Sequence, residues 1–122
     1  MSYIDGFVAP IPAGVTREDY SAFASKAAAI MREHGALRIV ETWGDDVPHG
    51  TVTDFYRAVA AEEGEGIVFS WVEWPDKATR DTGMKRAMED PRMQADALPM
   101  PFDGKRLIYG GFVTILDEGG AR

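Results

Sequence analysis

The chain has 122 residues, of which 45% are hydrophobic and 11% aromatic, and its formal net charge is −7. A chain of this length fits one domain with a packed core, so we expect residues 1–122 to form a single domain with a flexible tail at 117–122. The acidic charge argues against nucleic acid and anionic membranes as partners, and the absence of cysteine excludes disulfides and thiolate chemistry.

The amino terminus lacks a basic stretch followed by an apolar run, so we expect no signal peptide. No apolar run approaches the roughly 20 residues that a membrane-spanning helix needs. We therefore expect a cytoplasmic protein with no membrane partner.

The first half of the chain predicts two strands around one helix. Residues 3–12 (YIDGFVAPIP) are typical of a strand that its prolines end. Thr16 is the expected N-cap of a helix with an apolar stripe, and Gly35 is the expected residue just after its end. Residues 36–43 (ALRIVETW) predict the second strand.

The second half begins with the turn GDDVPHG at 44–50 and an ambiguous segment at 51–66, interpreted as a short strand or turn and two helical turns. A third strand follows at 67–74 (IVFSWVEW). Asp76 is then the expected N-cap of a helix reaching Glu89, whose inner face we assign to Thr79, Gly83, Met84, Ala87 and Met88. A short helix at 92–98 and a fourth strand at 105–116 complete the pattern.

The predicted order is strand, helix, strand, strand, helix, strand. This order is typical of the α+β class and of the ferredoxin-like split βαβ arrangement, a four-stranded antiparallel sheet with two helices on one face. The other face of such a sheet must be solvated or buried against something else.

Alternation along each strand separates two sets of side chains, because successive residues point to opposite faces. We assign the smaller, aliphatic set to the helix side: Ile4, Gly6, Val8, Val40, Val68, Ser70, Val72, Ile108, Gly110 and Phe112. We assign the aromatic and acidic set to the uncovered side: Tyr3, Asp5, Phe7, Ile39, Glu41, Trp43, Phe69, Trp71, Glu73, Tyr109 and Val113. An aromatic face of this size predicts a homodimer whose two sheets pack into one barrel with a cavity.

Three carboxylates of that set, Asp5, Glu41 and Glu73, are the candidate chemical groups. Glu41 and Asp5 are candidates for an acid–base pair, or for a divalent-cation site together with Glu73. The alternative is that they form structural ion pairs with nearby arginines, and this alternative is the favoured one. The expected partners are Arg38, Arg57 and Arg106.

The remaining candidates are aromatic or lie near the turn at 44–50. Trp43, Trp71 and Tyr109 suit either an interface core or stacking on a flat ligand. His49 is interpreted as a turn residue, or as a base oriented by Asp45 or Asp46, and Arg57 is a further candidate ligand contact.

Several strings resemble the YbaA-like proteins, family 1428 of the domains of unknown function, over residues 3–112: YIDGFVAPIP, HGALRIVETWGDDVPHG, VFSWVEWPDKATRDTG, DPRM and MPFDGKRLIYGGF. The resemblance implies a ferredoxin-like fold that pairs into a dimeric α+β barrel. It implies no established reaction and no catalytic residue.

Two functions follow as hypotheses. The first is a non-catalytic dimeric module. The alternative is an enzyme or binder for a small apolar or aromatic molecule that needs no cofactor, with residues 51–59 as a lid over the barrel cavity.

Overall fold

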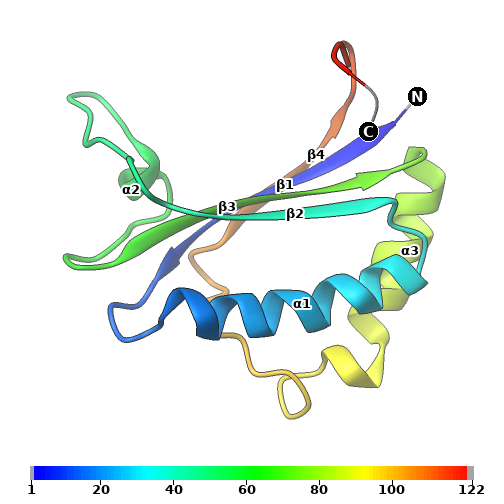
Figure 1. Cartoon of the computed structure of the whole chain (residues 1–122), viewed down its shortest axis with the longest axis horizontal. Coiled ribbons are helices and arrows are strands. Elements are labelled where there is room, and N and C mark those ends of the chain that lie inside the picture. Colours follow the sequence, from blue (N-terminus) through cyan, green and yellow to red (C-terminus); the bar gives the residue numbers. More distant parts are fainter. Residues whose placement is uncertain (1, 121–122) are drawn as a thin grey trace.

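A four-stranded antiparallel sheet lies across the computed structural model, which describes residues 2–120, and its two long helices pack on one side of the sheet (Figure 1). The elements, in chain order, are β1 (Tyr3–Ile11), α1 (Arg17–Glu33), β2 (Arg38–Trp43), α2 (Phe55–Ala58), β3 (Gly66–Trp74), α3 (Lys77–Glu89), the 3-10 turn η1 (Pro91–Met93) and β4 (Ile108–Val113). The strand order β2-β3-β1-β4 is the ferredoxin-like order, which confirms the predicted fold class.

Both long helices begin at the predicted caps. The Thr16 hydroxyl accepts a hydrogen bond from the Asp19 backbone N–H, and the Asp19 carboxylate accepts one from Thr16 in return. The Asp76 carboxylate accepts a hydrogen bond from the backbone N–H of Thr79 at the start of α3. Gly35, at φ 112°, has the left-handed conformation that ends a helix.

Two segments differ from the predictions. Residues 51–66 contain no strand before β3, and their helix is the single turn α2 behind the N-cap Asp54. The helix expected at 92–98 is reduced to η1, which starts at Pro91. Both segments lack the apolar stripe that stabilises longer helices by packing.

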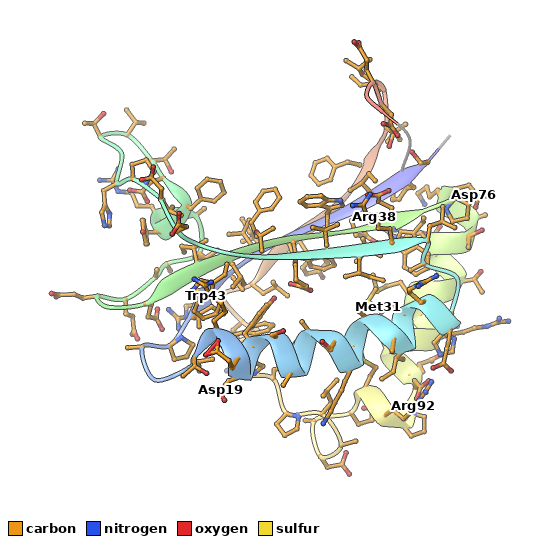
Figure 2. The ribbon with its side chains drawn as sticks, in the orientation of Figure 1. Asp19, Met31, Arg38, Trp43, Asp76 and Arg92 are labelled. Atoms are coloured by element: carbon orange, nitrogen blue, oxygen red, sulfur yellow. The ribbon has the colours of Figure 1, made fainter. Side chains whose placement is uncertain are left out.

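The core fills the space between the helices and the sheet. One cluster packs around Trp74, which has no exposed surface, and includes Tyr3, Met31, Ala36, Val72 and Ala87. A second cluster contains Ala9, Ile11, Tyr20, Ala24 and Val68. Figure 2 shows Met31 on the side of α1 that faces the sheet. The predicted inner face of α3 is right for the buried Gly83 and Ala87 and wrong for Met88, which is 50% exposed.

Strand register corrects the predicted assignment of side chains to faces. Directly paired residues of antiparallel strands share a face, and Asp5 pairs with the buried Val72, as Glu41 pairs with the buried Ser70. Asp5 and Glu41 therefore lie on the helix side, not on the uncovered side. Figure 2 shows Trp43 on the α1 side of β2 and Arg38 on the opposite side.

The prediction was right for β3 and wrong for β1, β2 and β4, where the two sets are exchanged. The uncovered surface, called the open face below, carries Ile4, Gly6, Val8, Arg38, Val40, Thr42, Phe69, Trp71, Glu73, Ile108, Gly110 and Phe112. In Figure 1, α2 with its loops rises above one end of the open face, and the chain beyond β4 rises above the other end.

Within residues 2–120, no helix is both long enough and apolar enough to cross a membrane.

Candidate functional site

An apolar trough of about 830 Å³ occupies the open face. Its lining includes Ile4, Val8, Phe69, Trp71, Ile108, Phe112 and residues 114–117. The Phe112 ring lies across two glycines, since a methyl group at Gly6 or Gly110 would come within 3.7 Å or 3.5 Å of it. Phe112 is still 62% exposed, so the trough presents a large aromatic surface that nothing within residues 2–120 covers.

Glu73 is a polar group on β3 placed among these apolar residues. The Trp71 indole N–H donates a hydrogen bond to Glu73 Oε2 over 3.0 Å. The register sets Glu73 opposite Arg38 on one side and Ile4 on the other. The trough therefore combines an apolar floor with the carboxylate of Glu73, which can receive a hydrogen bond from a ligand, and with a second carboxylate, Asp117, in its lining.

Tyr109 also lines the trough, from the edge strand β4. Its ring is 75% exposed and stacks on Phe7 at a centroid distance of 6.4 Å. The structure thus brings together two of the residues that we predicted as ligand contacts, Trp71 and Glu73, whereas Tyr109 only borders the trough, because its register partner Phe7 lies on the helix side.

Glu41 and Trp43 belong to a different site, a groove of about 350 Å³ between α1 and β2. The buried Tyr20 hydroxyl donates a hydrogen bond to Glu41 Oε1 over 2.6 Å. The Tyr20 ring lies 6.1 Å from the Trp43 ring. We call this site the α1–β2 groove.

Burial sets the electrostatics of the α1–β2 groove. Loss of water around the carboxylate raises the pKa of Glu41, and hydrogen bonds from Tyr20 and Ser70 offset part of that rise. Burial also raises the pKa of Tyr20, and its hydrogen bond to the Glu41 carboxylate raises it further. Tyr20 therefore stays protonated and acts as a hydrogen-bond donor.

Asp5 is held by α3. Its carboxylate is almost fully buried and accepts hydrogen bonds from the Trp74 indole N–H at 2.9 Å and from Arg80 Nε at 3.0 Å. The Arg80 guanidinium also lies 4.9 Å from the centre of the Tyr3 ring. The predicted structural ion pair is therefore present, but its cation is Arg80 rather than Arg38, Arg57 or Arg106.

His49 and Arg57 lie outside both sites, around α2. The His49 ring stacks on Tyr56 at 4.3 Å, and its Nδ1 lies 3.8 Å from Asp54. Asp54 also caps α2 and lies 3.9 Å from Arg57 Nε. The carboxylate beside His49 is thus Asp54, not Asp45 or Asp46 as expected.

Asp45 and Asp46 line a separate small pocket of about 220 Å³ with Phe55 and Phe69.

The proposed three-carboxylate cation site is wrong, because Asp5 and Glu41 lie on the helix side and Glu73 lies on the open face. Throughout residues 2–120, no group of three or more His, Asp or Glu side chains is arranged to hold a metal ion.

The roles of Tyr20 in the α1–β2 groove and of Phe112 in the trough were not predicted from the sequence. Tyr20 follows the apolar spacing of α1, so nothing in the pattern separated it from a packing residue. Phe112 was placed under the helices. The pairing of a buried helical hydroxyl with a strand carboxylate could be predicted only if the strand register were known.

The pH dependence of stability tests whether the pKa of Glu41 is raised in the folded chain. Because its pKa is higher in the folded chain, the folded state binds more protons, and stability falls as pH rises from 4.5 through the folded pKa. We expect the variant Glu41→Gln to melt at a higher temperature than the wild type at neutral pH, with a smaller difference at pH 4. A thermal melt at both pH values measures this, and a difference that does not change with pH would contradict it.

The strand order, the two helices on one face and the open face define an α+β protein of the ferredoxin-like class. The chain belongs to the family described as "Protein of unknown function (DUF1428)", whose sequence model matches residues 2–104. It is 55% identical over 118 residues to the uncharacterized protein YbaA of Escherichia coli K12, covering 97% of this chain and 100% of the relative. The YbaA protein of Shigella flexneri matches with the same identity and coverage.

Two solved structures share the fold. One is a variant of SnoaB, a cofactor-independent oxygenase from Streptomyces nogalater, with a TM-score of 0.60, 13% identity and coverage of 95% of each chain. The other is At3g17210 from Arabidopsis thaliana, with a TM-score of 0.56, 12% identity and coverage of 95% of this chain and 98% of that chain. At these identities the likeness concerns the fold alone.

Proposed function

We propose that this chain forms a cytoplasmic homodimer whose two open faces enclose a chamber that binds a small apolar or aromatic molecule without chemical conversion. The observation that carries the proposal is the apolar trough of about 830 Å³ on the open face. The net charge of −7 argues against a nucleic acid as the occupant.

A second copy is the partner that suits the trough. Large contiguous apolar patches on soluble proteins mark interaction sites, and an apolar patch is complementary to its own copy across a two-fold axis. Several apolar side chains that line it are exposed: Phe112, Ile115 and Leu116 are 62%, 91% and 77% exposed. The family resemblance, which implies a dimeric barrel, points the same way.

A ligand chamber follows from the shape and lining of the trough. Its volume lies within the range of roughly 300–1,000 Å³ that small-molecule pockets occupy. Trp71, Phe69 and Phe112 offer flat apolar surfaces, and Glu73 offers one polar contact that fixes orientation. Such a lining suits an apolar or aromatic molecule with one hydrogen-bond donor.

Binding without catalysis is favoured because the two carboxylates considered for acid–base work, Asp5 and Glu41, lie on the other face. A cofactor-free enzyme in the same chamber is the second candidate. Its support is the position of Glu73 in the trough and the fold shared with a cofactor-independent oxygenase. Turnover of a bound aromatic compound that Glu73→Gln abolishes, with binding retained, would favour this candidate over simple binding.

Phe112→Glu tests the dimer. Two copies of the variant would bring additional carboxylates into an apolar interface, so we expect dimer dissociation to become at least about 100-fold more favourable. Sedimentation equilibrium measures the effect against the monomer mass of 13.4 kDa.

Met88→Glu is the matched control, because Met88 is 50% exposed on α3, on the helix side. We expect it to remain dimeric like the wild type. A wild-type chain that is monomeric at micromolar concentration, or a Phe112→Glu variant that dimerises normally, would contradict the proposed dimer.

A further inference from the structure

The α1–β2 groove lies on the helix side of the sheet, so it is separate from the trough and from the ligand proposed there. Two opposite charges line it: Arg17 at the first turn of α1 and Glu41 in the middle of β2. Arg17 lies three residues before Tyr20, so both project from one face of α1. Since Tyr20 contacts Glu41 directly, Arg17 and Glu41 line the groove from the same side of α1.

Neither charge has an ionic partner among residues 2–120. The ion pairs there involve other carboxylates and other cations, including Asp5 with Arg80 and Glu65 with Arg106. Arg17 and Glu41 take part in none of them, and they do not pair with each other. The groove therefore offers an anion and a cation at separate positions.

The other residues that line the α1–β2 groove leave space for a ligand and can make weaker contacts with it. Beyond Arg17 and Tyr20, the α1 side of the groove consists of the small residues Ser21, Ala24, Ser25 and Ala28. Because these side chains are short, they do not fill the space next to β2, and the groove has a volume of about 350 Å³. Trp43 and Tyr20 form an aromatic wall beside Glu41, and two serine hydroxyls can donate or accept hydrogen bonds.

The geometry points to a binding site in the α1–β2 groove for a small zwitterion of the amino-carboxylate class. Its ammonium group pairs with Glu41, its carboxylate pairs with Arg17, and an apolar or aromatic side group packs against Trp43. Two charge-assisted contacts in a partly desolvated groove recognise such a molecule more strongly than either charge alone. A ligand with one charge leaves the other protein group unpaired.

Three probes of nearly equal shape separate these contributions at neutral pH. Phenylalanine carries both charges, 2-phenylethylammonium lacks the carboxylate, and 3-phenylpropionate lacks the ammonium. Two-dimensional NMR of the full chain follows the backbone resonances of residues 17–28 and 38–43. We expect phenylalanine to shift them saturably at millimolar concentration, and each one-charge probe to bind about tenfold more weakly or worse.

Paired variants assign the two contacts. Glu41→Gln keeps the side-chain size, Arg17→Gln keeps a polar side chain without the charge, and each is expected to weaken the binding of phenylalanine about tenfold. Glu18→Gln and Arg32→Gln remove a charge from α1 outside the groove and are expected to leave binding unchanged. Resonances far from the groove report whether each variant is folded.

The site is refuted if phenylalanine gives no saturable shift, if it binds no better than the one-charge probes, or if the control variants weaken it as much as the groove variants. Shifts confined to Phe69 and Trp71 would assign the probe to the trough and also overturn the inference. Because the trough lies on the opposite face, dimerisation and trough binding can fail or succeed independently of this result.

Discussion

Asp5→Ala is expected to lower the free energy of unfolding by about 3–4 kcal/mol, because it removes the buried carboxylate that pairs with Arg80 and leaves the buried Trp74 indole N–H without its acceptor. The Asp5 carboxylate receives the Trp74 indole N–H and two nitrogens of Arg80 within 3.2 Å. Arg80 is 23% exposed at the side chain, so some water can reach its guanidinium, and the loss falls at the lower end of the range for buried pairs.

Denaturant unfolding of the wild type and of Asp5→Ala measures this difference. Asp81→Ala is the matched control, since Asp81 also contacts Arg80 at 2.8 Å but lies 48% exposed, and we expect a much smaller loss there. Equal losses for the two variants would show that the buried Asp5 pair contributes no more than a surface contact.

Gly83→Ala is expected to destabilise the fold by about 2–3 kcal/mol despite the better helix propensity of alanine. Gly83 of α3 lies close to His34, the residue that ends α1, and to the Trp74 ring. A methyl group there would lie 2.3 Å from the His34 carbonyl oxygen and 2.5 Å from the Trp74 ring. The first contact is backbone and the second is a fully buried ring, so neither can move away cheaply.

Thr82→Ala tests whether the effect is steric, because Thr82 neighbours Gly83 on α3 and is exposed. We expect that variant to stay within about 0.5 kcal/mol of the wild type. A Gly83→Ala chain that is as stable as the wild type would mean that α3 can shift without loss of packing around Trp74.

The local features of this fold were readable from the printed sequence. Thr16 and Asp76 are short polar side chains ahead of helical spacing, and Gly35 tolerates the left-handed backbone, so the helix limits were predictable within a few residues. The strands were predictable for the same reason, since alternation and flanking turn residues are properties of neighbouring positions. The order of these elements was enough to predict the ferredoxin-like sheet.

The register between strands determined which residues form each candidate site. Alternation within β1 separates Asp5 from Ile4, but it cannot say which of them shares a face with Val72 of β3, and a shift of one residue exchanges the two sets. That choice moved Glu41 and Trp43 from the expected dimer cavity to the α1–β2 groove, and brought Phe112 into the trough.

The partners of Asp5 and Glu41 could not be predicted from the sequence either. Arg80 lies 75 positions after Asp5, and Glu41 lies 21 positions after Tyr20, so these pairs meet only when the helices pack on the sheet. Helix and strand formation follows from interactions a few residues apart, which composition and spacing record. Contacts across the core depend on how the whole chain buries its apolar surface, and no local pattern encodes that.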